Sequence, residues 1–283
     1  MPAQTTIAEK SLAEMLQHRF GDFSAAPAPE IAANPTLNRM AGRGVVRRFK
    51  PELLPKALVD TLCAVALSAP SKSDLQGRDI LIVEDAAIRA RINNLLADQD
   101  WIPKAPHFII FLGNNRRQRQ VHDWRGHTFA NDHLDAFFNA AVDAGIALSA
   151  FVTAAEAVGA GCCPVSVIRN YATEVSKLLG LPDHVFPVAG MGFGWPDVAC
   201  NISARLPLAA TVHRDRFDDC TREVVVAYDK RRNEIFPYRS QRNVAKFGTS
   251  PDYGWSEEKA RHYAEPERAD FGAFVRAKGF KLD

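Results

Sequence analysis

Hydrophobic positions follow two different spacings along the chain. Apolar residues recur at helical spacing over 55–69, 86–97, 134–158 and 172–179, which predicts helices buried on one face. Short continuous apolar runs over 79–84, 107–112 and 185–194 predict strands. The polar segment 114–135 between them is typical of a solvated loop or helix. The pattern predicts mixed helices and strands without internal repeats.

Glycine is concentrated in the stretch from 159 to 207. This stretch predicts the end of a helix, a turn containing glycine and proline, a short helix, an apolar strand and a loop. Glycine is expected where one backbone passes close to another backbone or to a flat ligand. Two interpretations therefore stay open, a tightly packed buried unit or one wall of a ligand site. The glycines concerned are Gly159, Gly161, Gly190, Gly192 and Gly194.

The first 38 residues differ from the rest of the chain. Residues 6–20 place Ile7, Leu12, Met15 and Phe20 near one face and predict a short helix. Residues 24–35 are rich in proline and alanine and predict an extended linker. We expect an N-terminal arm and linker over 1–38, followed by one domain over 39–283.

Composition and charge exclude several classes of protein. A net charge of +2 in 283 residues is too small for a general polyanion-binding surface, so nucleic-acid binding through Lys230, Arg231 and Arg232 is disfavoured. The N-terminus lacks a signal pattern, and no apolar run reaches the roughly 18 residues of a membrane span. We expect a cytoplasmic protein with no nucleic-acid or membrane partner.

Cysteine and histidine spacing gives no sign of a metal. The five cysteines contain no CxxC pair and fit reduced thiols better than disulfides or zinc ligands. His122, His127 and His133 match no HExxH or compact zinc pattern. We therefore expect no metal site.

Two stretches carry groups that suit a phosphate. Arg43 and Arg47 are four residues apart, and two guanidinium groups can converge on one phosphate, although a solvated basic turn has the same pattern. The loop from Ser71 to Gln76 can supply hydroxyl and backbone donors, although its serines could equally satisfy the carbonyls of a helix end. The small residues of the helix over 134–158 suit a central or subunit-interface helix.

Several segments resemble the nitroreductase family of flavin enzymes, most of all its oxygen-insensitive, NADPH-dependent group A members and their flavin reductase relatives. The similarity runs from about residue 37 to the end of the chain. Its most specific part is the run LLGLPDHVFPVAGMGFGWP followed by RLP. The segments that carry it are RGVVRRF, SAPSKSDLQ, VGAGCCPVSVIRN, SKLLGLPDHVFPVAGMGFGWP and RLPLAATVHRDRF.

The resemblance implies a fold and an activity. The fold is an α+β three-layer sandwich, with a mostly antiparallel central sheet flanked by helices, in a domain-exchanged homodimer with FMN at the interface. The activity passes hydride from NAD(P)H through FMN to an electron-poor acceptor such as a nitroaromatic, a quinone or free flavin. The chemistry belongs to FMN, so no residue is nominated as catalytic. A flavin-binding or flavin-processing protein of the same fold that is not a reductase is the alternative.

The resemblance also implies where the cofactors bind. Arg43, Arg47 and Arg205 correspond to the FMN phosphate site, and backbone at Ser166 and Val167 faces the ring near N5. Arg239, Arg242 and Lys246 are candidates for contact with the 2′-phosphate of NADPH. The full set predicted to bind FMN is Arg43, Gly44, Val45, Arg47, Ser71, Lys72, Ser73, Gln76, Gln99, Pro164, Val165, Ser166, Val167 and Arg205.

The chain departs from the family pattern at several of these positions. Val45 replaces a serine, and Ser203 replaces a lysine that precedes the RLP motif. Ser166 and Val167 replace a glycine pair, and Pro164 replaces an aromatic residue. We expect FMN still to bind, with its affinity and the substrate pocket altered at these positions.

Overall fold

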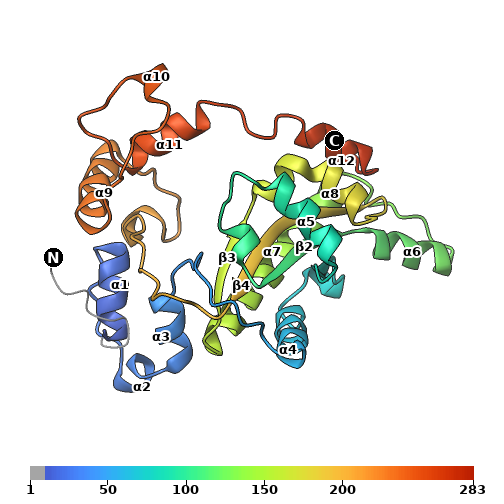
Figure 1. Ribbon diagram of the computed structural model, residues 1–283, viewed down its shortest axis with the longest axis horizontal. Helices are drawn as coiled ribbons and strands as arrows, with labels where there is room; N and C mark the ends of the chain where they lie inside the picture. The colour runs from blue at the N-terminus through green and yellow to red at the C-terminus, as the bar shows by residue number, and fades with distance from the viewer. Residues whose placement is uncertain (1–9) are drawn as a thin grey trace. The chain divides into compact units, whose positions relative to one another are not determined.

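The structure, a computed structural model, describes residues 10–283 (Figure 1). The chain divides into two compact units. Unit 1 contains the described residues up to Gly44 together with Cys200–Glu267, and unit 2 contains Val45–Ala199 and Arg268–Asp283.

Unit 2 is built on one antiparallel sheet of four strands. The strands are β1 (Arg78–Ile82), β2 (His107–Asn114), β3 (Gly161–Val165) and β4 (Val185–Gly194). Their order in the sheet is β1-β2-β4-β3, so β1 and β3 form opposite edges. Every adjacent pair is antiparallel, which confirms the predicted sheet.

Helices cover both faces of this sheet. Successive side chains of a strand point to opposite faces, and β2 is buried along nearly its whole length. Ile109 and Phe111 join one apolar cluster, whereas Phe108, Ile110 and Leu112 join another. The resulting helix–sheet–helix sandwich confirms the three-layer α+β fold (Figure 1). On the first face lie α4 (Lys56–Leu67) and α7 (Leu134–Ala157), and on the second α5 (Ala86–Leu95), η3 (Ile102–Lys104) and α8 (Ala172–Leu178).

The C-terminal residues of the chain pack into unit 2. Phe274 and Val275 of α12 (Phe271–Ala277) and Phe280 beyond it are buried with Phe186 of β4. Phe280 meets Phe186 edge-on, with ring centroids 5.4 Å apart. The end of the chain therefore completes the apolar packing beside β4.

Two local expectations for unit 2 need refinement. Residues 161–165, predicted as a turn, form strand β3, and Pro164 is tolerated there because β3 is an edge strand. Gly161 is required because a Cβ at this position would lie 2.5 Å from the Val46 side chain. Part of the polar segment 114–135 forms helix α6 (Arg116–Arg125).

Unit 1 is helical, and its N-terminal part is folded. The helices are α1 (Leu12–Phe20), α2 (Pro29–Ala32), α3 (Pro35–Gly42), η5 (Leu208–Ala210), α9 (Arg222–Ile235), α10 (Val244–Phe247) and α11 (Trp255–Tyr263). The start of the helix predicted over 6–20 lies outside the described residues. Helix α1 begins after Ser11, which forms a capping box with Glu14 in the first turn.

The prediction of an extended linker over 24–35 was wrong in its second half. Pro29 and Pro35 are the first residues of α2 and α3, where a fixed φ and a missing N–H favour helix initiation. Leu12 and Met15 of α1 pack against Ala41 and Ile202. The N-terminal arm is therefore an integral part of unit 1.

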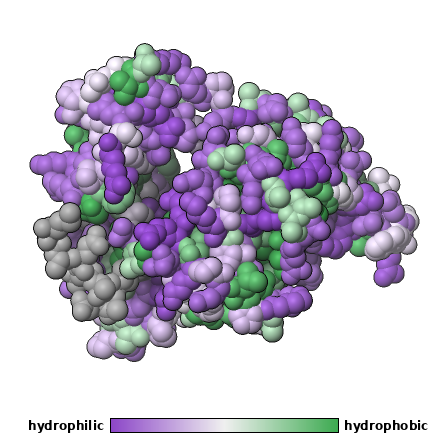
Figure 2. Space-filling view, viewed as in Figure 1, coloured by the Kyte–Doolittle hydropathy of each residue, from purple (hydrophilic) through white to green (hydrophobic). Residues whose placement is uncertain are grey.

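Helix α7 combines a buried face with an exposed apolar face. Among the described residues it is the one helix long and apolar enough to cross a membrane, which alone is weak support for a span. Its buried face packs on the sheet, whereas Leu134, Phe138 and Val142 are exposed at a spacing of four residues. Elsewhere hydrophilic residues cover most of the face in Figure 2, with separate apolar patches between them.

Phe151 of α7 is the residue whose truncation tests the first apolar cluster. Its ring meets Phe111 and Phe193 edge-on, with centroids 6.0 Å and 5.1 Å away. Phe151→Ala removes both contacts and leaves a cavity, so we expect the free energy of unfolding to fall by about 3 to 5 kcal/mol. Urea unfolding measures this, and the same truncation at the exposed Phe217 is the control, expected within about 0.5 kcal/mol of the parent protein. Equal effects would contradict the placement of Phe151 in the core.

Candidate functional site

Unit 1 brings Arg43 and Arg205 to one pocket. Arg43 is the residue that ends α3. Arg205 lies on an extended segment in which Ile202 and Ala204 point inward and Ser203 and Arg205 are exposed. Both arginines line a pocket of about 550 Å³. Residues separated by most of the chain thus present two guanidinium groups to one cavity.

Glycine at position 44 lets these two segments approach each other. A Cβ at Gly44 would collide with the carbonyl oxygen of Asn201. The backbone that follows Arg43 therefore runs directly against the backbone that precedes Arg205. No other residue type fits at position 44 without moving one of the two segments.

Arg19 and three aromatic residues also line this pocket, and Ser203 lies beside Arg205. Phe20, Tyr228 and Trp255 contribute to the lining, and the last two meet edge-on at 5.3 Å. The Arg205 Nη1 donates a hydrogen bond to the Ser203 Oγ at 2.6 Å. Position 203 therefore provides a hydroxyl that contacts Arg205 and adds no charge.

Val45 and Arg47 belong to unit 2 and lie beside the edge strand β3. Val46 between them is buried, and its N–H donates to the Cys162 carbonyl of β3 at 3.1 Å. Because side chains alternate along an extended segment, Val45 and Arg47 point to the opposite side, where both are exposed. Position 45 therefore presents an apolar side chain on the same side as Arg47.

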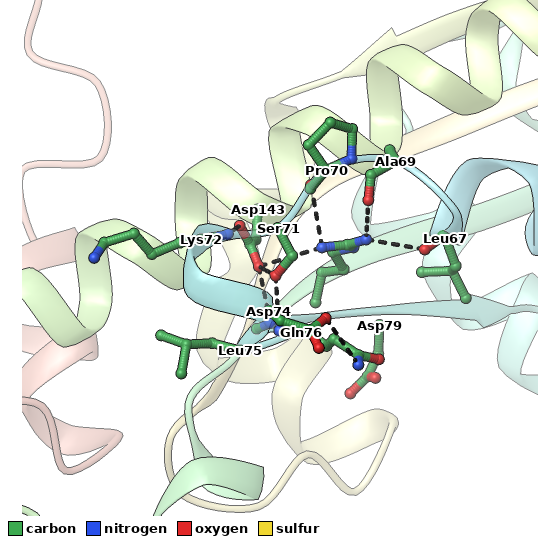
Figure 3. Close-up of polar contacts among 12 residues, drawn as sticks. Leu67, Ala69, Pro70, Ser71, Lys72, Asp74, Leu75, Gln76, Asp79 and Asp143 are labelled. Atoms are coloured by element: carbon green, nitrogen blue, oxygen red, sulfur yellow. Dashed lines mark hydrogen bonds and ion pairs between the residues drawn. The ribbon is translucent and has the colours of Figure 1, made fainter.

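A buried carboxylate, which was not predicted from the sequence, holds the loop from Ser71 to Gln76 (the serine loop). Asp143 of α7 accepts hydrogen bonds from the Ser71 Oγ at 2.6 Å, the Lys72 N–H at 3.1 Å and the Gly77 N–H at 2.9 Å (Figure 3). The Arg78 guanidinium lies 3.4 Å away, and both charged side chains are almost fully buried. The Ser71 hydroxyl thus donates its hydrogen bond to Asp143.

The backbone of this loop adopts an unusual conformation. Ser73, Asp74 and Gln76 have φ values of 48°, 54° and 52°, in the left-handed region that non-glycine residues seldom occupy. The Gln76 N–H donates to the Ser71 Oγ at 2.7 Å, and the Gln76 carbonyl accepts from Arg117 at 2.6 Å. Contacts at both ends of the loop therefore hold a backbone conformation that its non-glycine residues disfavour. The side chains of Lys72, Ser73 and Gln76 are exposed.

Opposing effects set the pKa of Asp143. Burial alone would raise the pKa of this carboxyl. Hydrogen bonds from Ser71 and from the backbone of Lys72 and Gly77, together with the charge of Arg78, outweigh burial and lower the pKa below its usual value. Asp143 is therefore ionised in the folded protein at neutral pH.

The remaining predicted FMN contacts lie elsewhere in unit 2. Pro164 and Val165 end β3, and Ser166 and Val167 begin the helical turn η4 (Val167–Tyr171). Gln99 lies in the turn between α5 and η3, where its Oε1 is 3.4 Å from the Trp101 Nε1. Trp101 and Val167 pack in the same apolar cluster, on the face of the sheet opposite α7.

A single copy of unit 2 does not bring all of these residues together. The serine loop leads into β1, whereas Pro164 to Val167 follow β3, and these strands are opposite edges of the sheet. Three strand spacings separate the two edges, about 14 Å. The serine loop and the end of β3 are therefore two separate groups of candidates within one chain.

Two of the three candidates for the NADPH phosphate are paired with acidic residues. The Arg242 Nε lies 2.9 Å from Glu258, and the Lys246 Nζ contacts Glu265. Arg239 is exposed. These pairs reduce the positive charge that the loop presents to a ligand.

Comparison with known proteins decides the family. The model of the nitroreductase family matches residues 40–195, and that of the nitroreductase family C-terminal domain matches residues 203–283. The chain belongs to the nitroreductase family. Within this family it is 27% identical to the FMN reductase (NADPH) of Bacillus subtilis, over 87% of this chain and 98% of that protein.

Two other members of the nitroreductase family support this placement. The oxygen-insensitive NADPH nitroreductase of Salmonella typhimurium is 29% identical over 72% of this chain and 83% of its own length. The crystal structure of nitroreductase A from Vibrio parahaemolyticus superposes with a TM-score of 0.78 at 26% identity, over 88% of this chain and 98% of the other. The shared fold thus covers nearly the whole of the Vibrio parahaemolyticus structure.

Among the described residues of this nitroreductase-family chain, no three His, Cys, Asp or Glu side chains gather as a metal site. Two residues of the candidate site were missed from the sequence: Asp143, which holds the serine loop, and Arg19, which lines the pocket of unit 1. Asp143 carries a usable signal, because it is the one charged residue between Asp135 and Glu156 in an otherwise apolar helix. Arg19 carries none, because an arginine near the end of a surface helix is ordinary.

The charge of Asp143 gives a test of this arrangement. Asp143→Asn leaves Arg78 buried without its anionic partner, so we expect the variant to lose about 3 to 5 kcal/mol of unfolding free energy at pH 7. The folded-state pKa of Asp143 is lowered, so this contribution is complete above the unfolded pKa of about 4 and is lost as the pH falls through the lower folded pKa.

Urea unfolding of both proteins between pH 7 and pH 3 measures the effect. The stability gap between parent and Asp143→Asn should narrow below about pH 4. The exposed Asp123→Asn is the matched control and should change stability by no more than about 0.5 kcal/mol. A gap that stayed constant or widened in acid would show that Asp143 is not a stabilising carboxylate.

Proposed function

We propose that this protein is an FMN-dependent oxidoreductase that takes hydride from NAD(P)H and passes it to an electron-poor acceptor, a nitroaromatic, a quinone or free flavin. The observation that carries the proposal is the pocket of unit 1 that Arg43 and Arg205 share. It occurs in a chain that aligns with nearly the whole of an FMN reductase and most of an NADPH nitroreductase.

The residues of unit 1 fit the phosphate of FMN. Three arginines, Arg19, Arg43 and Arg205, line one cavity, and the planar forks of guanidinium groups suit the oxygens of a phosphate. Gly44 permits the close backbone approach that brings the two segments together. We assign Arg43, Gly44 and Arg205 to the phosphate, and we keep Arg47 of unit 2 as a candidate on the resemblance to the family.

The residues of unit 2 are proposed to hold the ring and its chain. The serine loop presents exposed polar side chains from a backbone fixed by Asp143. The segments at Gln99 and at Pro164 to Val167 provide an amide and backbone groups for the ring. When bound, FMN supplies the hydride chemistry, and these residues supply the slot, the orientation and the hydrogen bonds.

We also propose that the protein is a homodimer with exchanged termini and a flavin site completed by the second copy. Within one chain the serine loop and the end of β3 lie at opposite edges of the sheet. The exposed stripe of Leu134, Phe138 and Val142 on α7 would be covered by the partner. Because the other side of α7 packs on the sheet, a second copy explains the stripe better than a bilayer does, and we propose a cytoplasmic location.

Two further assignments are part of the proposal. Residues 39–283 form the FMN-binding domain, including the C-terminal helices. Arg239, Arg242 and Lys246 contribute to recognition of NADPH, with Glu258 and Glu265 as competing partners for the last two cations.

Flavin binding and reduction test the function. We expect the purified protein to show flavin absorbance or to bind added FMN, and NADPH to bleach the bound flavin in a stopped-flow experiment. Arg205→Gln should weaken FMN binding roughly 10- to 100-fold, because a hydrogen-bonded charge contact is lost. Arg48→Gln is the control, since Arg48 forms an exposed pair with Asp197 that contributes little.

The outcomes separate the candidate functions. A protein that binds no FMN would overturn the proposal. A protein that binds FMN but is not reduced by NADPH or NADH would instead be a flavin-binding protein without reductase activity.

The dimer has its own test at α7. Val142→Glu places a charge in the exposed apolar stripe, so we expect the dimer to dissociate and FMN affinity to fall with it. Light scattering after size exclusion measures the mass in solution. Val226→Glu on α9 makes the same change at another exposed valine and should leave the mass unchanged. A monomeric parent protein, or a dimeric Val142→Glu variant, would contradict the proposed interface.

A further inference from the structure

We propose that Arg19, in the N-terminal arm, is a positioning residue that holds Arg43 and Arg205 in place for the phosphate group, so that the arm sets the affinity for phosphorylated flavin. This inference rests on the proposed function, because it concerns the same pocket. It assigns a role to residues that precede position 40, where the match to the nitroreductase family model begins.

The guanidinium group of Arg19 is buried and joins the two segments that carry the pocket arginines. Its Nη2 donates to the Ala41 carbonyl at 2.8 Å and to the Arg43 carbonyl at 2.7 Å. Its Nη1 donates to the Ser203 carbonyl at 3.2 Å. One planar group therefore ties the end of α3 to the extended segment that contains Arg205.

Contacts in the reverse direction strengthen the connection. The Arg205 N–H donates to the Arg19 carbonyl at 2.7 Å, at the C-terminal end of α1. Arg231 of α9 donates to the carbonyls of His18, Arg19 and Arg205 at 3.0, 3.1 and 2.6 Å. The last carbonyls of α1, which have no partner within the helix, are thus used to hold the Arg205 segment.

Asp22 adds a second attachment just beyond α1. Its carboxylate accepts from the N–H groups of Leu208 and Ala209 at 2.9 Å each, at the start of η5. Gly21 makes the turn between the two attachments with φ of 82°, and a Cβ there would lie 2.7 Å from the Arg231 side chain. The N-terminal arm therefore forms hydrogen bonds with both ends of the segment 203–209.

How the pocket arginines are held matters because the neighbouring Ser203 adds no charge. Its hydroxyl accepts a hydrogen bond from the Arg205 Nη1. Binding of a phosphate then depends on how well the guanidinium groups converge. Arg19 also lines the pocket, but both of its Nη atoms donate to backbone carbonyls, so the proposed role is to hold the two segments.

The comparison of FMN with riboflavin, which lacks the phosphate, tests this role. We expect Arg19→Gln in the full-length protein to weaken FMN binding roughly tenfold and to leave riboflavin binding within about twofold. Fluorescence titration measures both affinities, and thermal unfolding checks the fold. Arg39→Gln, at an exposed arginine on α3, is the matched control and should keep the parent preference for FMN.

Two more variants make the test independent of a loss of folding. Arg19→Lys keeps the charge but cannot reach both segments with a planar fork, so we expect it to lose the FMN preference as well. Asp22→Ala removes only the second attachment and should lower the preference by a smaller factor.

The results distinguish this inference from the proposed function. Parent protein that binds neither flavin would reject the function and the inference together. Parent protein that prefers FMN, with Arg19→Gln or Arg19→Lys keeping that full preference, would reject the inference alone. Equal weakening of FMN and riboflavin in Arg19→Gln would show a general structural role and would also overturn the inference.

Discussion

Burial of the Asp143 carboxylate beside the Arg78 guanidinium is the constraint on which much of unit 2 depends. Neither charge is tolerated in the interior without a partner, so α7, the start of β1 and the serine loop must be correctly placed together. Arg78 also donates to the carbonyls of Leu67, Ala69 and Pro70, which satisfies the end of α4. One polar cluster therefore connects α7, the start of β1, the end of α4 and the serine loop.

The sequence predicted the elements that are decided by burial. Strands β2 and β4 and helices α4, α5, α7 and α8 lie close to the predicted ranges, because their apolar spacing records contact with the sheet. Strand β3 was missed because a run of Gly, Cys, Cys, Pro and Val has no alternation, and its place at the sheet edge depends on β4. Helices α2 and α3 were missed because proline was taken as a mark of extended chain, although it also begins helices.

For the candidate site, local motifs were informative and long-range partners were not. The pairing of Arg43 with Arg205 came from resemblance to a family, and the structure places both on one pocket. The hydrogen bond from Ser71 to Asp143 joins residues that are 72 positions apart, and no local sequence pattern predicts this contact. The same holds for Arg19 and the carbonyl of Ser203, which are 184 positions apart. Polar contacts of this kind depend on the finished fold, whereas apolar periodicity depends only on which side of an element is buried.

The two groups of site residues differ in how their geometry is maintained, and this difference bears on specificity. In unit 2 the serine loop is held by buried, charged hydrogen bonds within the core, which tolerate little change. In unit 1 the pocket arginines are held through backbone carbonyls by side chains of the N-terminal arm and α9. Such contacts can be added at the surface without repacking a core. The pocket of unit 1 is therefore the part that this chain could adjust most readily, and both the N-terminal arm and Ser203 contact its arginines.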